Sequence, residues 1–467
     1  MSKSKTFGPV SAIKSRDSLQ TEKMSEKVRE RLRHPQFQMR LLVAAAVVWH
    51  LMIATTVYEI GKHQLAPNQI YQSGIGKFAS DGLAYEPQCV ELCSVMKNDG
   101  PIAWLTWPTQ LHVRLYSLPL MVFIRWSAFN ILTIEPLNLL YYLGIVALVF
   151  KLGEKVYDRT SGLVAAFIVA VWPSFLIHTT QLLRDPLLIL AVLVFLWSIG
   201  EPLRREFSWR RAILLVIAAT VSIVTIRIVR LPMWTLLCVF AGFAVLLLVI
   251  RFVQTRRISR TAAAFGVILI TVVAITPRFQ PLFHNQQELR RPRAIVPEAI
   301  QQLPVDQQIA ARRAGFQFRM EEGNVGPADD GSRIDAEVRF RSIGDMVRYA
   351  PRALVIGIFA PFPNMWFGVG KQVGGGGRWI SGFEMFITYL LEGLALFGLW
   401  VARRKLEAWL LCGVALLGSV ALGLVVNNIG ALYRLRYPFW IIMVIISAGG
   451  LVHLLRSRVF KWRAFRS

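Results

Sequence analysis

The sequence predicts an all-α, polytopic transmembrane helical protein with about ten spans (10–12) and two large extracytoplasmic loops. Of the 467 residues, 54% are hydrophobic and only 17% are charged, and the mean hydropathy is +0.47. Several apolar runs approach ~20 residues, about the length of helix that crosses the hydrocarbon core of a bilayer. These observations exclude a chain that is built only of soluble domains.

About ten apolar runs are expected to cross the membrane as helices. Two further stretches, 112–133 and 351–368, are ambiguous, because the first contains a histidine and two arginines and the second is broken by prolines. Neither is expected to cross, and both are expected along the outer interface as amphipathic or re-entrant segments. The expected spans cover about 41–59, 137–153, 161–178, 185–200, 212–228, 231–251, 261–277, 383–401, 406–426 and 437–455.

The distribution of lysine and arginine orients these spans. The net charge is +25, and the basic residues gather in the N-terminal segment, in "KLGEKVYDR", "EPLRREFSWRR", "RFVQTRRISR" and "VARRK", and in the tail "RSRVFKWRAFRS". Cytoplasmic loops carry such an excess, so both termini are expected in the cytoplasm and the protein in the inner (plasma) membrane. If 112–133 also crossed, the loops between 151 and 260 would carry most of that charge to the outside. The charge therefore indicates topology and contact with membrane lipids, and no binding of nucleic acid is expected.

This topology divides the chain into five parts. No cleaved signal peptide is expected, because the basic N-terminal residues contain no leading apolar core. Glycines 374–377 predict a flexible joint or a mobile lid in the second outer loop. The parts are a cytoplasmic basic segment 1–40, a transmembrane module 41–277 with the first outer loop 60–136, an extracytoplasmic loop or lid region 278–382, C-terminal transmembrane helices 383–455, and a cytoplasmic basic tail 456–467.

The cysteines and histidines give no metal or redox signature. Cys238 and Cys412 fall inside apolar runs and are expected to be inert. Cys89 and Cys93 lie in a polar loop, where a disulfide could form outside the cytoplasm, although an unbroken helix would disfavour an i,i+4 bond. The 7 histidines are scattered without ligand spacing, and the sequence has no HExxH, CxxC or Walker motif. Charged residues are nearly absent from mid-span positions, which disfavours an ion-coupled transporter.

The first outer loop contains a candidate catalytic carboxylate in "FASDGLAYEPQC". On a helix, Asp81 and Tyr85 would share a face. An ionised carboxylate near the membrane surface could serve as a general base for a hydroxyl nucleophile. The letters "SDG" equally mark a helix cap or a turn, so a structural role for Asp81 stays open. Glu86, Glu91 and Asp99 are weaker candidates in the same loop.

Asp185 is a second candidate carboxylate, at the outer end of a span. It precedes Pro186, so it is expected to cap a helix whose first position is proline, or to point into the site. The neighbouring Arg184 fits either a salt bridge or an anion contact.

Arginines near the outer ends of spans are candidate phosphate ligands. The motif "YRLRYP" places Arg434, Arg436 and Tyr437 just before the last span. Guanidinium groups bind phosphate in a bidentate manner, so several that converge would suit a lipid phosphate or pyrophosphate. Each one alone could instead extend to lipid headgroups. Further arginines at outer span ends are Arg227, Arg230, Arg348 and Arg352.

The sequence resembles the GT-C superfamily of membrane glycosyltransferases, and is most similar to the bacterial branch related to protein O-mannosyltransferases and aminoarabinose transferases (glycosyltransferase family 39-like). The resemblance lies in "DGLAY" of the first loop, in "KLGEKVYDRTSGLVAAFIVAVWPSFLIHTTQLLRDPLLILAVLVFLW" and in "LYRLRYPFWIIMVI". It covers roughly 40–230 and 345–455.

The resemblance implies a sugar donor on a polyprenyl phosphate and a hydroxyl acceptor (glycan, lipid or protein) at the outer face. It matches Asp81 to the catalytic carboxylate of the first loop, Asp185 to the acidic residue that opens the fourth span, and Arg436 with Tyr437 to the pair near the lipid phosphate. Asp81 is followed by glycine rather than by a second acidic residue, which leaves Glu86 open. No D-x-D motif occurs in the second outer turn, so no cofactor is expected, although a divalent metal could still take part.

The sequence therefore predicts a glycosyltransferase of cell-envelope polysaccharide biosynthesis. Asp81 would be the base and Asp185 would orient the reacting groups, while Arg434 and Arg436 would hold phosphate and Tyr85 and Arg184 would bind substrate. This hypothesis requires Asp81 and Asp185 to meet. One alternative is a polysaccharide polymerase or O-antigen ligase acting on lipid pyrophosphate-linked chains, with basic residues of the second loop at its site. The other is a non-enzymatic transporter of lipid-linked sugars.

Overall fold

The chain divides into two units, residues 1–49 and residues 50–467. The first unit contributes the start of helix α2 (Pro35–Lys62), and all the contacts discussed below lie within the second unit. The expectations for residues 1–34, for much of the region 278–382 and for the end of the tail fall outside the described residues. The computed structural model describes residues 35–204, 207–256, 259–276, 300, 303–321, 333–367 and 374–464.

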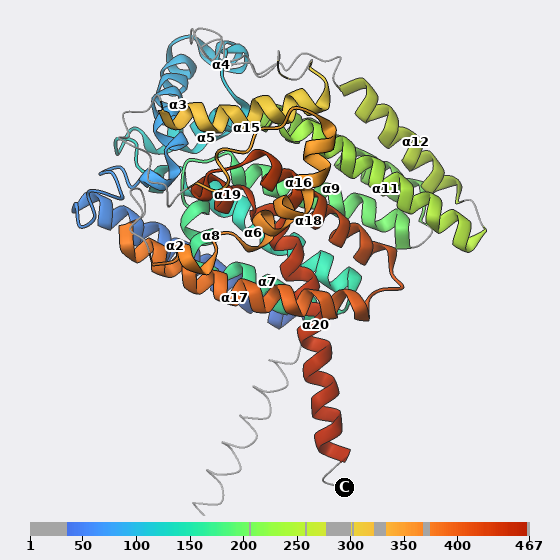
Figure 1. Ribbon diagram of the computed structural model, residues 1–467. Helices are drawn as coiled ribbons and strands as arrows, with labels where there is room; N and C mark the ends of the chain where they lie inside the picture. The colour runs from blue at the N-terminus through green and yellow to red at the C-terminus, as the bar shows by residue number, and fades with distance from the viewer. Residues whose placement is uncertain are drawn as a thin grey trace, which may run out of the picture. The chain divides into compact units, whose positions relative to one another are not determined.

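The described part of the chain is helical, and its only β pairing consists of isolated bridges (Figure 1). After α2, the first half contains η1 (Lys77–Ala79), α3 (Asp81–Asn98), α4 (Gly100–Thr106), α5 (Leu111–Phe123), η2 (Ile131–Thr133), α6 (Glu135–Val156), α7 (Arg159–Ala170), α8 (Pro173–Thr179) and α9 (Asp185–Arg204). The second half contains α10 (Trp209–Val229), α11 (Met233–Thr255), α12 (Arg260–Ile275), α15 (Val305–Glu321), α16 (Ile343–Phe359), η5 (Pro363–Met365), α17 (Gly374–Val401), α18 (Leu406–Val425), α19 (Ile429–Leu435) and α20 (Tyr437–Ala464).

The helix lengths confirm an all-α polytopic membrane protein. Among the described residues, 8 helices are long and apolar enough to cross a membrane, or 9 if the bent pair α7 and α8 forms one span. The number is lower than the expected ten. The helices that qualify are α2, α6, α9, α10, α11, α17, α18 and α20.

Two expected spans account for the difference. The run 161–178 is not one straight helix, because α7 and α8 meet at an angle of 67°. Trp172 is extended there and precedes Pro173, whose ring disfavours helical backbone at the residue before it. The described helix of the run 261–277 is α12, which has 16 residues, fewer than a full span requires.

The two ambiguous stretches do not form full spans. The apolar helix α5 within 112–133 has 13 residues, and α16, which enters 351–368, is not among the helices that qualify. The structure differs from the expectation of a flexible joint or a mobile lid at residues 374–377. These glycines form the first turn of α17.

Glycines let α16 and α18 approach closely. A β-carbon added to Gly357 of α16 would lie 2.1 Å from the backbone oxygen of Ser419 in α18. A β-carbon on Gly423 of α18 would lie 2.0 Å from the backbone oxygen of Ala353. Both positions therefore require glycine, and any larger residue would push the two helices apart.

Gly357→Val is expected to lower the free energy of unfolding by about 1–3 kcal/mol or more, because the added atoms overlap a backbone that cannot move alone. Thermal unfolding in detergent measures this effect. Gly242→Val is the matched control, since a β-carbon at Gly242 of α11 meets nothing within 4 Å. Equal melting temperatures for the two variants would contradict the close packing of α16 on α18.

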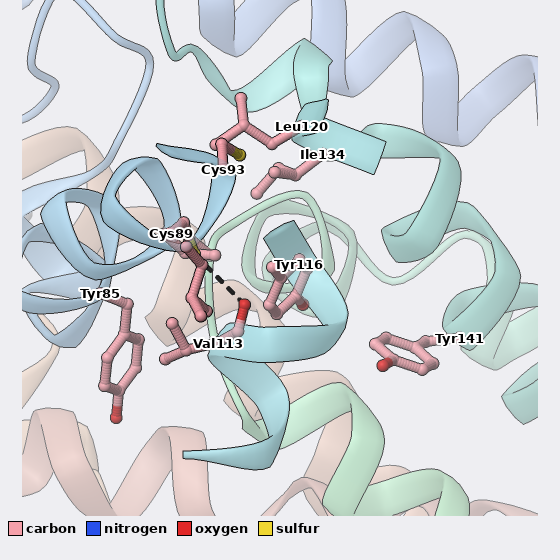
Figure 2. Packing of buried hydrophobic residues seen from close by; sticks show 10 residues of the cluster. Tyr85, Cys89, Cys93, Val113, Tyr116, Leu120, Ile134 and Tyr141 are labelled. Carbon is pink, nitrogen blue, oxygen red and sulfur yellow. Dashed lines mark hydrogen bonds between the residues drawn. The ribbon is translucent and has the colours of Figure 1, made fainter. Parts of the chain in front are cut away.

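The cysteines of the first outer loop are buried and free. Cys89 and Cys93 lie one turn apart on the unbroken helix α3, and neither forms a disulfide. The Cys89 thiol donates to the carbonyl of Val113 at 3.5 Å (Figure 2), and the Cys93 thiol donates to that of Ser117 at 3.7 Å. Burial raises the pKa of Cys93 to about 11. Both thiols therefore pack α3 against α5 and are poor nucleophiles.

Candidate active site

Asp81 and Asp185 each stand at the start of a helix. Asp81 lies in the first turn of α3 and Asp185 in the first turn of α9. A negative charge is favoured there by the unpaired N–H groups and the helix dipole. The capping role expected for Asp81 is not formed, because Ser80 is the N-cap residue of α3 and no side-chain capping hydrogen bond is present there. The carboxylates of Asp81 and Asp185 pair with arginines instead.

One arginine joins the two carboxylates. Nη2 of Arg434, on α19, donates to Oδ2 of Asp81 at 2.7 Å. Nε of the same guanidinium lies 3.0 Å from Oδ2 of Asp185. The two aspartates, which are far apart in the chain, therefore meet around a single cation, as the glycosyltransferase hypothesis requires.

A second arginine binds Asp185 from the turn between α10 and α11. Nη1 of Arg230 donates to Oδ1 of Asp185 at 2.8 Å. Asp185 is 6% exposed, whereas the side chain of Asp81 is 35% exposed. Asp185 is thus the enclosed member of the pair, held by two cations, and Asp81 is the member that remains open to solvent.

Arg184 is a third cation at the site, and its side chain makes no ion pair or hydrogen bond to a described residue. Its Nε is buried without a partner. Its charge nevertheless acts on Asp81, Asp185 and Tyr85, so it lies close to all of them. Three guanidinium groups face two carboxylates, which leaves an excess of one positive charge.

The charges around Asp81 set its protonation. Burial alone would raise the pKa of Asp81, but the guanidinium groups of Arg434 and Arg184, and the hydrogen bond from Arg434, outweigh burial and lower it. Burial lowers the pKa of Arg230 to about 10, which still leaves it charged at neutral pH. The ion pair between Asp81 and Arg434 is therefore formed at neutral pH.

Tyr85 and His112 form one wall of the site. Tyr85 lies one turn after Asp81 on α3, as the spacing predicts, and Figure 2 shows its hydroxyl directed away from the cysteines. Its ring meets that of His112, on α5, edge to face at 4.5 Å. His112 is 1% exposed, and neither of its ring nitrogens has a hydrogen-bond partner among the described residues.

A buried polar network holds α8 and α19 in place behind the carboxylates. Oε1 of Glu384, on α17, accepts from the backbone N–H of Ser174 at 2.7 Å, and Oε2 accepts from the Tyr433 hydroxyl. The Tyr437 hydroxyl donates to Oγ of Ser174 at 2.9 Å. Because α8 leads into Arg184 and Tyr433 precedes Arg434, this network fixes two sides of the site relative to each other.

The other residues of the "YRLRYP" motif lie away from the carboxylates. Nη1 of Arg436 donates to the carbonyls of Ile358 at 2.9 Å and Ala360 at 2.6 Å. Its Nη2 lies 3.0 Å from the sulfur of Met385. Arg436 thus binds the end of α16, and Tyr437 belongs to the Ser174 network rather than to the charge cluster.

The structure therefore brings together Asp81, Tyr85, Arg184, Asp185 and Arg434 of the predicted site residues. Sequence reasoning did not select Arg230 from the arginines at span ends, and it missed the supporting network. A buried carboxylate inside an apolar run, Glu384, was the available signal, because such residues are costly unless paired.

The donor set of the site does not suit a divalent metal. No group of three or more His, Cys, Asp and Glu side chains converges within the described ranges. Both carboxylates already bind guanidinium groups, and a divalent cation would be repelled by the surplus positive charge.

Comparison of the sequence with family models and with curated proteins gives no match. Among solved structures, the chain is similar to the archaeal oligosaccharyltransferase from Archaeoglobus fulgidus in complex with an inhibitory peptide and a dolichol-phosphate. The identity is 14% and the TM-score is 0.47, over 89% of this chain and 51% of that one. For the apo form of the Archaeoglobus fulgidus oligosaccharyltransferase the identity is 14% and the TM-score 0.45, over 90% and 52%. The chain thus spans about half the length of these structures, and a similarity at this level assigns neither a family nor a function.

Proposed function

We propose that this protein is a membrane glycosyltransferase that moves a sugar from a polyprenyl-phosphate donor to a hydroxyl group of a glycan, lipid or protein. The reaction takes place at the outer face of the inner membrane. The observation that carries this proposal is the bridge from Arg434 to both Asp81 and Asp185, beside the unpaired Arg184.

The surplus positive charge supports binding of the donor phosphate. The side chain of Arg184 forms no hydrogen bond or ion pair with a described residue. A phosphate can therefore bind its guanidinium group without breaking an existing pair. Arg230 and Arg434 add charge from the other sides. In a partly enclosed site these interactions are stronger than in water, and they stabilise the negative charge that develops as the phosphate leaves.

The carboxylates support acceptance of the proton. The acceptor oxygen forms a bond to the anomeric carbon while the bond from that carbon to the phosphate oxygen breaks, and the phosphate leaves with the electron pair. Asp81 accepts the proton of the acceptor hydroxyl, which becomes acidic as its oxygen bonds to carbon. A phosphate that competes for Arg434 also weakens its hold on Asp81 and makes that carboxylate more basic. Asp185 keeps Arg434 and Arg230 in position throughout.

The polymerase or ligase alternative receives no support from Arg313, a buried arginine of the second loop. It predicts basic residues of that loop at the site. Arg313, on α15, instead donates to backbone carbonyls of Val338, Leu424 and Asp335, at 3.0, 3.0 and 2.6 Å. This arginine therefore secures the loop against the C-terminal helices.

Mass spectrometry of envelope glycans and lipid-linked sugars in a deletion strain tests the proposed function. We expect one glycan or glycolipid to lose a sugar and the matching polyprenyl-phosphate sugar to accumulate. Complementation with the wild-type gene restores both, and complementation with Asp81→Asn restores neither. An unchanged glycan and lipid profile in the deletion strain would refute the proposal.

A further inference from the structure

A second candidate site lies on the opposite face of α3 from Asp81. It is a cavity of about 670 Å³, within the range of ~300–1,000 Å³ that is typical of small-molecule sites. Leu83 and Glu86 of α3 line it, whereas Asp81 and Tyr85 occupy the other face of the same helix. The remaining lining residues come from the end of α2 and the loop 64–73, and from the stretch 127–130.

The cavity and the charge cluster share their supporting segments. Gln181 lies in the short loop that leads to Arg184, and its Oε1 accepts from the backbone N–H of Gly76 at 2.7 Å. Its Nε2 donates to the carbonyl of Gly74 at 3.4 Å. The backbone N–H of Ile131 donates to the carbonyl of Ser73 at 3.0 Å, which joins the two loops of the cavity wall. A ligand in the cavity therefore lies one helix away from Asp81.

Uncharged polar groups and apolar groups share the lining about equally. Gln64, Gln72 and Asn130 supply amides, and Ser73 and Ser127 supply hydroxyls. The lining itself contains no lysine or arginine that could form a bidentate contact with a phosphate or a pyrophosphate. This chemistry separates the cavity from the arginine cluster, where we place the donor phosphate.

Glu86 is the one charged group of the lining. It is half-buried, and its carboxylate makes no hydrogen bond or ion pair to another described residue. A half-buried carboxylate that lacks a partner can accept hydrogen bonds from ligand hydroxyl or amino groups. Burial raises the pKa of Glu86, which agrees with a carboxyl group that no cation stabilises.

Aromatic rings complete the lining. Tyr58, Tyr71 and Phe129 face the cavity. The ammonium groups of Lys62 and Lys77 lie 5.7 and 5.5 Å from the ring centres of Tyr58 and Tyr71, which holds those rings in place. Rings and hydrogen-bonding groups together match a sugar, which presents C–H groups on its faces and hydroxyl groups at its edges.

We infer that this cavity binds the glycan acceptor, as a neutral or amino-sugar oligosaccharide whose reactive hydroxyl extends around the start of α3 toward Asp81. The inference rests on the proposed function, because it narrows the acceptor to a carbohydrate. The acceptor would pass from the cavity to the charge cluster over Ser80 and Asp81. Ser80 is exposed, and the side chain of Asp81 is 35% exposed.

Equilibrium binding of soluble trisaccharides to the full-length protein in nanodiscs tests the inference. The probes are chitotriose, cellotriose, mannotriose, the chitosan trimer and, as an anionic comparison, the trimer of galacturonic acid. We expect at least one neutral or amino-sugar probe to bind, and Glu86→Gln and Tyr71→Ala each to weaken it at least tenfold. Glu91→Gln is the matched control, since Glu91 lies on α3, is exposed and does not line the cavity.

Three results would overturn the inference: no probe binds the wild type, the bound probe keeps its affinity in both cavity variants, or the galacturonic acid trimer binds best. The melting temperature of each variant shows that it is folded. Binding in the cavity with no sugar transfer in cells would refute the proposed function alone. Sugar transfer without binding in the cavity would refute the acceptor site alone.

Discussion

Arg434→Gln is expected to lower kcat/KM for sugar transfer by about a thousandfold. The substitution removes the cation that joins Asp81 to Asp185. Removal of one partner from a fully buried ion pair costs about 3–5 kcal/mol, and the loss here is smaller because Asp185 keeps Arg230 and Asp81 is partly exposed. Transfer from a polyprenyl-phosphate sugar, measured with the purified protein, and thermal unfolding report the two consequences separately.

The double variant Arg434→Gln/Asp185→Asn separates loss of chemistry from loss of folding. Removal of the Asp185 charge relieves the buried carboxylate that Arg434→Gln leaves with only Arg230 as a partner. We expect the melting temperature to recover toward the wild-type value while transfer stays lost. Recovery of transfer in the double variant would show that Arg434 only stabilises the fold.

Asp81→Asn is expected to lower kcat by about 10²–10⁴-fold, the range that general-base catalysis contributes. Donor binding is expected to stay within a few-fold of the wild type, because Arg184, Arg230 and Arg434 remain. Single-turnover transfer measures the chemical step, and equilibrium binding of the donor measures the affinity. A large loss of donor affinity with an unchanged chemical step would assign Asp81 to binding instead.

The lowered pKa of Asp81 determines the pH range in which its protonation changes stability and kcat/KM. A carboxylate whose pKa is lower in the folded state stabilises the protein fully above its ordinary pKa of 3.8 and loses that contribution as the pH falls through the lower folded-state value. Protonation of Asp81 in the free enzyme therefore produces no acidic limb in kcat/KM between pH 5 and 8. A limb in that range that disappeared in Asp81→Asn would contradict the observed pairing with Arg434.

The central pair was predictable because its residues stand out in the sequence. Asp81 and Asp185 are acidic residues at helix starts on the outer side of the expected topology, where burial is costly without a partner. The same sequence did not reveal which arginines meet them. Arg434 and Arg436 are two positions apart. Because each residue of a helix is rotated by about 100° from the one before it, their side chains point in different directions.

Arg227 and Arg230 illustrate the same limit. Both lie near the C-terminal end of α10, yet Arg230 binds Asp185 whereas the guanidinium of Arg227 lies 5.2 Å from the ring centre of Trp234. The choice depends on how α9, α10 and α11 pack, and the hydrophobic pattern of three apolar helices does not specify their rotation about their axes. The break between α7 and α8 was visible in "WPSFL", but a broken and a straight span have the same hydropathy.

The affinity of a polyprenyl monophosphate for wild type and for Arg184→Gln tests the central claim most directly. Arg184 contacts no described acceptor with its side chain, so its removal breaks no known pair in the protein. A hydrogen bond to a charged group contributes about 1.5–3 kcal/mol, so we predict binding weaker by roughly 10–150-fold, and the melting temperature of the variant shows that it is folded. Equal affinities for the two proteins would contradict the account, because the surplus positive charge beside Asp81 and Asp185 would then not bind the phosphate.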